Sequence, residues 1–381
     1  MADHTAVAIV GAGPAGLLLA NRLLAQGLDC TVFERRSRRD LEQLPRAGLL
    51  TPASVAVLDR NNLAASLRVD STPHTTCAFR IDGRETLLAY ARYARRHHTV
   101  YAQHHLVRDL ISTYLDAGGD LRFSTPCTAV TDLDNSPHAT VHTGAAAFTC
   151  TYVVGCDGSR GVSRGALAPY TISHHSADPW VAVLAACPPS VDHITYALHP
   201  DGFAGHMLRD KVTSRFYLQC NPAETTDDWP AERIWEQLRR RLSLSQSSWS
   251  LTEGPILSRE VVNMTSEVST RLQRGRLYLV GDAAHTVSPA GAKGLNLALA
   301  DADHLATALI TALQKKDERQ LNAYSEDRLP HIWQAQQFSH EFLNLLNTPH
   351  DPFRYQLNSA RLGQLFSSPS HAVSFALDYT R

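Results

Sequence analysis

The chain has 381 residues, with 36 Lys and Arg against 37 Asp and Glu, and its formal net charge is −1. This balance argues against a nucleic-acid partner and against attraction to an anionic membrane surface. No apolar run is long enough to cross a bilayer, and the apolar start lacks the basic residues of a signal peptide, so we expect a cytoplasmic protein. The seven cysteines contain no CxxC pair, which argues against a disulfide framework or a zinc knuckle.

The first segment of the chain has the pattern of a β-α-β unit. Residues 7–10 predict a buried strand, and the stretch from the following turn to Gln26 predicts a helix with one apolar face. Gly27 ends this helix, and residues 30–34 predict the next strand. The turn between the first strand and the helix has the sequence Gly11-Ala-Gly13-Pro-Ala15-Gly16.

This glycine turn matches a dinucleotide-binding fingerprint in the context that the fingerprint requires. Gly11 permits the tight turn, Gly13 lets a pyrophosphate approach the backbone, and Gly16 lets the helix pack closely on the strand. Glu34, at the end of the second strand, can accept hydrogen bonds from ribose hydroxyls. The unit predicts a dinucleotide cofactor, held by these residues and Ala15, without distinguishing FAD from NAD.

The rest of the chain alternates between two kinds of pattern. Residues 106–115 predict a helix that ends at Gly118, and residues 180–220 predict strands rich in β-branched and aromatic side chains. Residues 277–280 predict a second buried strand and residues 294–313 a long helix. The remainder has helical spacing of apolar residues. The absence of a repeat or linker predicts interwoven domains.

Two later motifs identify the cofactor. Gly281-Asp282 follows the second buried strand and precedes Gly294-Leu295-Asn296, and this pair resembles the second FAD motif of flavoprotein monooxygenases. A helix beginning at Gly294 would direct its N-terminus toward the flavin pyrimidine edge, where reduction builds negative charge. Between the ends of the chain, Asp157 lies in a segment that resembles the family's central Asp-Gly motif, associated with flavin and nicotinamide.

Over nearly its whole length the chain resembles the para-hydroxybenzoate hydroxylase family of group A flavoprotein monooxygenases. Residues 45–48, 101–103 and 196–203 carry much of this resemblance, and Arg46 and Gln103 match positions that contact FAD. The implied fold is α/β, with a Rossmann-like, three-layer FAD-binding domain interwoven with a β-sheet substrate domain and C-terminal helices. The expected segments are 1–72, 101–176 and 271–315 for FAD binding, 73–100 and 177–270 for substrate, and 316–381 for the helical interface region.

The resemblance implies a pocket for a small aromatic acid that reacts with O2. Arg209 would hold the substrate carboxylate with its guanidinium fork, and Tyr217 would add a hydroxyl. Tyr196 and Tyr379 match a tyrosine pair that relays the phenol proton, which makes the ring carbon ortho to the phenolate more nucleophilic. Pro289 would offer a carbonyl near the ring, in a reaction that proceeds through a C4a-hydroperoxyflavin. Trp180 matches a position that lines the pocket.

Several positions depart from the family pattern around the expected ring. Met207 replaces a serine, Gly205 a leucine, Ala290 a threonine and Thr51 a glutamate. These changes predict a looser grip on plain 4-hydroxybenzoate and more volume beside the ring. An amino-substituted benzoate, such as 3-amino-4-hydroxybenzoate or 4-aminobenzoate, is therefore a second expected substrate.

The reductant is expected to be NADH or NADPH, bound transiently because the chain has no second dinucleotide unit. Arg215 matches an arginine linked to movement of the flavin between buried and exposed positions. Arg35 keeps the family residue, whereas four other positions of the nicotinamide surface change: Asp40, Leu44, Arg160 and Thr265. The added carboxylate and lost guanidiniums disfavour a 2′-phosphate, which predicts that NADH works at least as well. The arginines at 36, 38 and 39 could restore that charge.

Three other interpretations can be stated from the sequence. The His97-His98, His104-His105 and His174-His175 pairs do not have metal-ligand spacing, so we expect no metal. A non-hydroxylating flavoprotein oxidase or reductase would not need Arg209 or the tyrosine pair. A non-catalytic FAD-binding protein would not reduce its flavin faster when an aromatic acid is present. Relatives suggest a homodimer.

Overall fold

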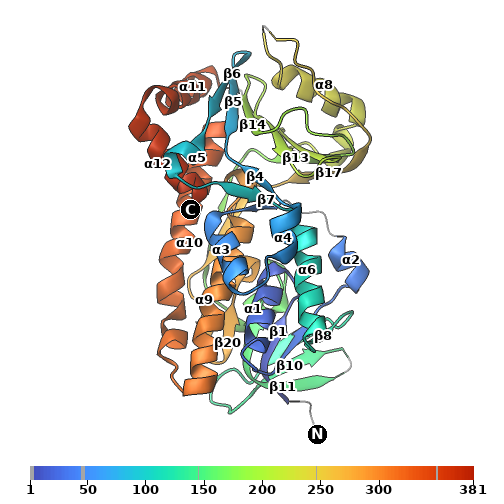
Figure 1. Ribbon diagram of the computed structural model, residues 1–381, viewed down its shortest axis with the longest axis vertical. Coiled ribbons are helices and arrows are strands. Elements are labelled where there is room, and N and C mark those ends of the chain that lie inside the picture. Colours follow the sequence, from blue (N-terminus) through green and yellow to red (C-terminus); the bar gives the residue numbers. More distant parts are fainter. Residues whose placement is uncertain (1–3, 44–47, 145, 246, 349–350) are drawn as a thin grey trace.

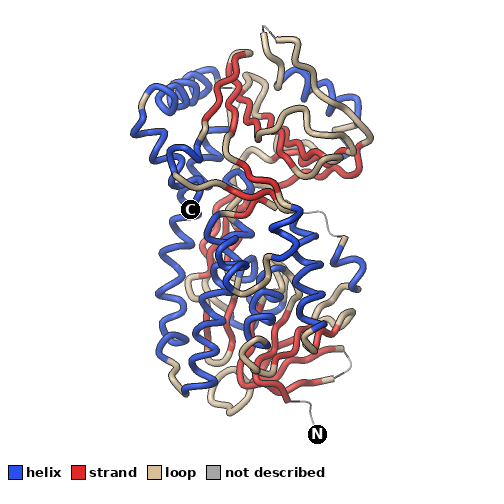
Figure 2. Tube along the Cα trace, in the orientation of Figure 1, coloured by secondary structure: helices blue, strands red, loops and turns tan. Residues whose placement is uncertain are grey.

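The computed structural model describes residues 4–43, 48–144, 146–245, 247–348 and 351–381. Figure 1 shows two lobes, one above the other, and Figure 2 shows that each contains its own group of strands. A long helix, α10 (Arg319–Leu346), runs beside the lower lobe and reaches the upper one. No helix in the described part of the chain is both long and apolar enough to cross a membrane.

The lower lobe is built on an eight-stranded sheet whose central strands are parallel. Strand β1 (His4–Val10) lies between β2 (Cys30–Phe33) and β11 (Ala147–Gly155), and its residues from Val7 to Val10 are buried. Helices α1 (Pro14–Leu24), α6 (Gln103–Asp116) and α9 (Gly294–Lys315) pack together in this lobe. The remaining strands are β8 (Asp120–Arg122), β9 (Cys127–Thr131), β10 (Ala139–Thr143), β19 (Gln273–Arg274) and β20 (Leu277–Leu279).

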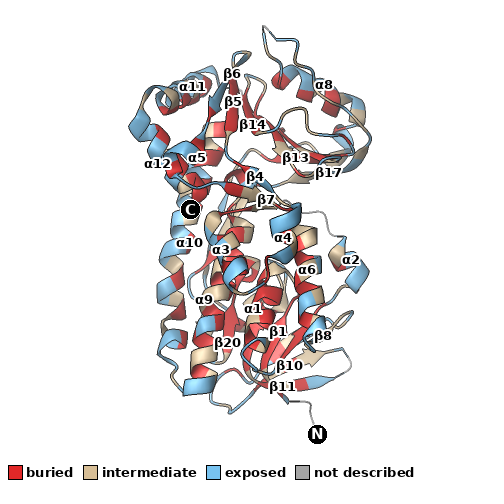
Figure 3. Cartoon of the chain, in the orientation of Figure 1, coloured by how far each residue is buried: buried red, intermediate tan, exposed pale blue. Residues whose placement is uncertain are grey.

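The upper lobe contains a seven-stranded sheet in which only β14 and β5 pair in parallel. One face packs against α8 (Ala231–Arg241), and the other contacts the C-terminal helices, so apolar side chains are buried on both faces. Figure 3 shows buried residues, in red, along the strands of this sheet. The strand order is β17 (Ile256–Val262), β13 (Trp180–Ala185), β16 (Ser214–Gln219), β15 (Ala204–Leu208), β14 (Ile194–Leu198), β5 (Cys77–Ile81) and β6 (Arg84–Leu88).

Smaller elements connect and cover these sheets. The three-stranded sheet of β3 (Leu49–Leu50), β7 (His98–Val100) and β4 (Thr72–His74) lies where the lobes meet (Figure 1). A second one contains β12 (Thr171–His175), β18 (Thr265–Ser269) and β21 (His285–Thr286). The other helices are α2 (Arg38–Glu42), α3 (Pro52–Arg60), α4 (Ala65–Asp70), α5 (Tyr90–Ala94), α7 (Val162–Leu167), α11 (Pro352–Ser367) and α12 (Pro369–Thr380), with short 3-10 turns at Thr226–Asp228, Gly281–Ala283 and Pro289–Gly291.

The expected α/β fold is confirmed, including the β-α-β start, the substrate sheet and the C-terminal helices. The sheet of the lower lobe is not wholly parallel, because β9, β10 and β19 pair antiparallel. These strands are short and lie close in sequence to their antiparallel neighbours, without the long crossover that parallel pairing requires. The segment boundaries expected for the domains remain predictions.

A buried aspartate joins three parts of the lower lobe. Asp301 of α9 is completely buried and accepts hydrogen bonds from His285 Nε2 at 2.6 Å, Arg328 Nε at 2.8 Å and the Gly281 backbone N–H at 3.2 Å. Burial alone would raise the pKa of Asp301, but His285 and Arg328 outweigh it and hold that pKa below its ordinary value. His285 is therefore a structural member of its motif.

Replacing this carboxylate should destabilise the fold. In an Asp301→Asn variant, Arg328 keeps a buried charge without its counter-charge, so we expect a loss of about 3–5 kcal/mol in the free energy of unfolding. Urea denaturation followed by tryptophan fluorescence measures this loss. Asp327→Asn is the control, because Asp327 is next to Arg328 in sequence, its side chain is 49% exposed, and its pair with His304 contributes at most about 1 kcal/mol. Equal losses in the two variants would contradict the assigned role.

Candidate active site

The glycine turn after β1 is shaped for close approach of a ligand to the backbone. Gly11 has a φ of +105°, and a Cβ there would lie 2.4 Å from the Cys156 carbonyl oxygen. A Cβ on Gly16 would lie 2.1 Å from the Gly11 carbonyl oxygen, so helix and turn are in direct contact. A Cβ on Gly13, at the N-cap of α1, would meet no atom within 4 Å. The turn therefore leaves open space beside a helix N-terminus, where a pyrophosphate binds favourably.

Glu34 lies at the end of β2, directly beside this turn. Its Oε2 accepts a hydrogen bond from the Ala12 backbone N–H at 2.9 Å, and its Oε1 accepts one from the Arg36 N–H at 2.9 Å. The carboxylate is thus fixed at the place where the sequence predicted a ribose contact. A carboxylate has lone pairs for further hydrogen bonds, so these contacts are compatible with ribose binding.

The central Asp-Gly motif and the Gly281 motif meet the glycine turn. Asp157 Oδ2 accepts a hydrogen bond from the Ser163 N–H at 2.9 Å, while its Oδ1 is buried without a partner among the described residues. Burial raises the pKa of Asp157. Arg164 links the two later motifs, since it donates to the backbone carbonyls of Asp282 and Ala283 at 2.7 and 2.8 Å. No sequence motif singled out Arg164.

At the start of α9, Asn296 binds the backbone of Leu49 and Thr51, shortly after the position of Arg46. Its Nδ2 donates to the Leu49 carbonyl at 2.9 Å, and its Oδ1 accepts from the Thr51 N–H at 2.8 Å. Gly294 begins the helix and Leu295 follows it, as predicted, whereas Arg46 lies outside the described residues. Gln103 begins α6, and Arg35 is exposed next to Glu34.

These observations fit FAD. The open space at Gly13, the fixed Glu34 carboxylate and the unpartnered Asp157 Oδ1 lie on loops that contact one another after parallel strands. In open parallel sheets, dinucleotides bind at such carboxyl ends of strands. The three motifs, far apart in sequence, therefore form one candidate cofactor site.

A second group of residues forms an aromatic cluster on the inner face of the upper sheet. Tyr196 of β14 and Tyr379 of α12 are buried, and their hydroxyl oxygens lie 3.0 Å apart in a hydrogen bond. Burial raises the pKa of both phenols, so both are neutral. Lys293 Nζ donates to the Tyr379 carbonyl at 2.9 Å and to the Asp378 carbonyl at 2.7 Å, which fixes the end of α12 to the loop before α9.

Arg209 directly follows β15 on the same sheet, and its side chain is buried. Burial lowers its pKa, with the positive charge of Arg215 as the next cause. Arg215 lies over the ring of Tyr217 and pairs with Glu260 at 3.6 Å. Tyr217 also packs against Trp180, with ring centroids 5.5 Å apart. The cluster thus has a cation beyond the end of β15 and hydroxyl groups on its neighbouring strands.

The space at Gly205 is smaller than the sequence suggested. Gly205 pairs with Tyr196 on one side and Tyr217 on the other. A Cβ on Gly205 would lie 2.8 Å from Met207 Cε and 2.8 Å from Phe203 Cζ. Part of the volume that the missing leucine was predicted to open is therefore occupied by the Met207 methyl group and the Phe203 ring. Ala290, after Pro289, is buried in the same cluster.

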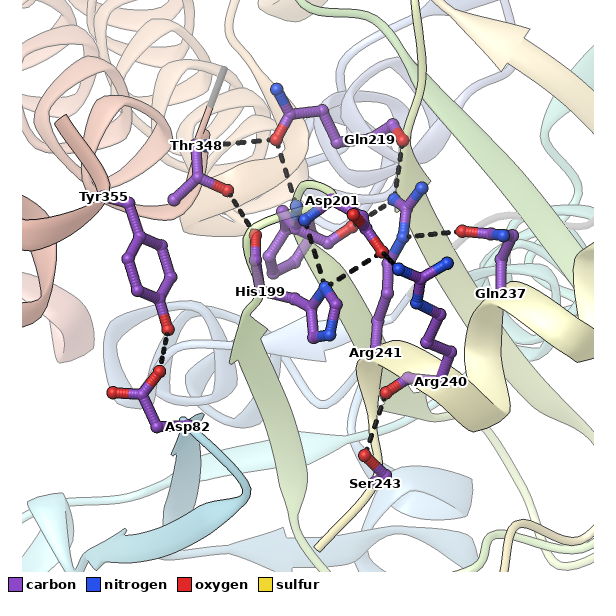
Figure 4. A network of polar contacts seen from close by, with 11 residues as sticks. Asp82, His199, Asp201, Gln219, Gln237, Arg240, Arg241, Ser243, Thr348 and Tyr355 are labelled. Carbon is purple, nitrogen blue, oxygen red and sulfur yellow. Dashed lines mark hydrogen bonds and ion pairs between the residues drawn. The ribbon is translucent and has the colours of Figure 1, made fainter. Parts of the chain in front are cut away.

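A polar network behind the cluster positions Phe203. Gln219 Oε1 accepts hydrogen bonds from the backbone N–H groups of Phe203 at 3.0 Å and Thr348 at 3.1 Å. Arg241 Nη1 donates to the Gln219 carbonyl at 2.8 Å and to the Phe203 carbonyl at 3.3 Å. Figure 4 shows Gln219, Arg241 and Thr348 converging from the sheet, α8 and the segment after α10. Sequence reasoning missed this network, because contacts to backbone groups leave no motif.

The comparisons with known proteins agree with this geometry. A model of the FAD binding domain family matches residues 4–339. The p-hydroxybenzoate hydroxylase of Acinetobacter baylyi is 31% identical, over 98% of this chain and 95% of that protein. The 6-methylpretetramide 4-monooxygenase of Streptomyces rimosus is 28% identical, over 87% and 82% of the two chains. The structure of p-nitrophenol 4-monooxygenase from Pseudomonas putida has a TM-score of 0.87 at 22% identity, covers 100% and 98% of the two chains, and supports the fold alone.

The chain therefore belongs to the family of proteins with this FAD binding domain. Within it, the protein is an FAD-dependent aromatic monooxygenase, and NAD(P)H is the reductant typical of the family. Among the described residues, no group of three or more His, Cys, Asp or Glu side chains is placed to hold a metal ion.

The space at Gly13 provides a test of the cofactor site. In a Gly13→Ala variant the new Cβ meets no protein atom, so the apoprotein should keep its melting temperature. The methyl group would enter the space expected for the pyrophosphate, and we expect FAD affinity to fall roughly tenfold or more. Flavin fluorescence titration of the apoprotein measures this affinity.

Gly165→Ala is the matched control, because a Cβ at Gly165 in α7 also meets nothing within 4 Å. It should bind FAD as the unmodified protein does. Unchanged affinity in Gly13→Ala would place the pyrophosphate elsewhere.

Proposed function

We propose that the protein hydroxylates a 4-hydroxybenzoate-type aromatic acid at the carbon ortho to its activating group. The observation that carries this proposal is the combination of buried Arg209 and the hydrogen-bonded Tyr196–Tyr379 pair on one aromatic sheet face. A carboxylate requires a cation when it leaves water, and a phenol requires a proton acceptor. The relative that is a p-hydroxybenzoate hydroxylase supports the same substrate class.

The residues of the cluster have separate tasks in this proposal. Arg209 binds the carboxylate through its guanidinium fork, and Tyr217 adds a hydroxyl hydrogen bond. Trp180 and Phe203, with ring centroids 4.4 Å apart, provide an apolar wall that excludes water from the ring. Pro289, whose backbone carbonyl accepts a hydrogen bond from the Ala292 N–H at 3.0 Å, would offer its remaining lone pair near the reacting carbon. FAD, when bound and reduced by a nicotinamide nucleotide, would activate O2, of which one oxygen atom goes to the ring and the other leaves as water.

The tyrosine pair moves the phenol proton. Tyr196 accepts the substrate proton while passing its own to Tyr379 across the 3.0 Å hydrogen bond. Tyr379 in turn releases its own hydroxyl proton toward solvent, so neither hydroxyl must hold a net charge in the buried cluster. The raised pKa of each tyrosine disfavours a resting phenolate on either residue. The negative charge therefore stays on the substrate, where it raises the electron density of the ortho carbon.

An amino-substituted benzoate is the second candidate substrate. The surroundings of Gly205 favour this substrate, because the side chain beside Gly205 is the methyl end of Met207 and not a branched side chain. Methionine is unbranched and adapts to an irregular neighbour, so this side chain can withdraw from an extra ring substituent. 3-Amino-4-hydroxybenzoate and 4-aminobenzoate should therefore be compared with 4-hydroxybenzoate.

Arg209→Ala tests the carboxylate clamp. If the clamp exists, the variant leaves a buried carboxylate without its cation, and binding of the aromatic acid should weaken by roughly 2–5 kcal/mol. Lys211→Ala removes an exposed cation two residues away and should bind as the unmodified holoenzyme does. Perturbation of the flavin spectrum by added benzoates measures the affinity.

Mass analysis of the products accompanies this titration. One added oxygen, ortho to the phenol or amine, is expected for the true substrate. Hydrogen peroxide formed in place of a hydroxylated product from every benzoate tested would favour an oxidase over the proposed function.

NADH is expected to reduce the flavin at least as fast as NADPH. The arginines after Glu34 have acidic neighbours of their own, since Arg36 lies 3.9 Å from Glu34 and Arg38 lies 2.7 Å from Glu42. Asp40 adds an exposed carboxylate to the same surface, which repels a 2′-phosphate. Initial rates with each nucleotide decide the matter, and a strong preference for NADPH would refute the expectation.

A further inference from the structure

A histidine from the lower lobe contacts the arginine proposed to bind the substrate. His104 lies in the first turn of α6, and its Nδ1 is 3.3 Å from Arg209 Nη2. Arg209 belongs to the upper sheet, immediately after β15. The pair therefore joins the FAD-binding lobe to the substrate sheet at the carboxylate end of the cluster. The sequence presented His104 only as half of a histidine pair.

The direction of this hydrogen bond follows from the charge of the imidazole. Burial, followed by the neighbouring His105, Arg209 and Arg108, lowers the pKa of His104 to about 4, against a smaller opposing effect of Asp210. The ring is neutral at physiological pH, so its Nδ1 can offer a lone pair. An arginine has donors and no acceptor, so Arg209 donates and His104 accepts.

The hydrogen bond from Arg209 to His104 matters because the residue at position 207 of β15 offers the guanidinium no strong acceptor. Met207, two residues before Arg209, has a thioether that cannot fix a guanidinium by a strong hydrogen bond. An arginine side chain has several rotatable bonds, and ordering it for bidentate binding costs rotamer entropy. His104, a neutral acceptor on α6 of the other lobe, can order the guanidinium before the acid binds, so less rotamer entropy is lost on binding. Because His104 is neutral, the positive charge of Arg209 remains available to the carboxylate.

We propose that His104 is a positioning residue that orients the guanidinium of Arg209 for the carboxylate of the aromatic acid. The inference rests on the proposed function, because it assumes that Arg209 binds the carboxylate. In this role, His104 is an acceptor that aligns the guanidinium of Arg209. Affinity for the acid then depends on a contact between the two lobes. His104 itself need not touch the substrate.

The test compares variants of the FAD-loaded protein by titration with 4-hydroxybenzoate and with the neutral 4-hydroxybenzamide. In His104→Ala we expect the dissociation constant for the acid to rise roughly tenfold, as for loss of one hydrogen bond to a charged group, with little change for the amide. His104→Asn should recover most of the affinity, because its Oδ1 can accept from Arg209 in a similar position. His105→Ala is the matched control, since His105 lies in the same helical turn with its ring centroid 4.1 Å from that of His104, and this variant should bind both ligands normally.

Arg209→Ala, measured in parallel, separates the two proposals. If Arg209→Ala loses affinity for the acid while His104→Ala binds it normally, the clamp stands and the positioning role is overturned. If Arg209→Ala also binds the acid normally, the clamp fails and the positioning role fails with it. Equal weakening for the acid and the amide in His104→Ala would indicate a general structural role and would also overturn the inference.

Discussion

The hydrogen bond between Tyr196 and Tyr379 is the contact on which the proposed substrate site depends. It joins the upper sheet to the last helix, across 183 residues of sequence. A buried hydroxyl without a partner costs roughly 1–3 kcal/mol, so each tyrosine requires the other. Because Lys293 also holds the end of α12 against the loop before α9, the position of Tyr379 and the position of the expected FAD motif are linked.

The proposed site has its cation and its pair of hydroxyl groups at two different positions. Arg209 lies beyond the end of β15, where His104 approaches it from the other lobe, whereas the tyrosine pair lies between β14 and α12. Aromatic rings cover the surface between these groups and keep water from weakening their electrostatics. The network of Gln219 and Arg241 holds the backbone of Phe203, so the aromatic wall of the proposed site is supported from behind.

Local patterns predicted much of the fold, because strands, helices and glycine turns depend on neighbouring residues. The turn from Gly11 to Gly16 and the helix from Gly294 were predicted from such patterns. The roles of Arg209 and the tyrosine pair came from family resemblance, since no local pattern relates positions so far apart. His104, Gln219 and Asp301 were missed because their partners become neighbours only in the folded chain. The space at Gly205 was overestimated, because the sequence does not show that Met207 turns toward it.

Proton release on substrate binding is a direct test of proton transfer through the Tyr196–Tyr379 pair. The FAD-loaded protein is mixed with 4-hydroxybenzoate in weakly buffered solution at neutral pH, and a pH indicator reports the protons released. We expect protons to be released as the bound phenol ionises through the tyrosine pair. We expect this release to be lost in a Tyr379→Phe variant that still binds the acid. Equal proton release by both proteins would contradict the claim that the pair carries the phenol proton.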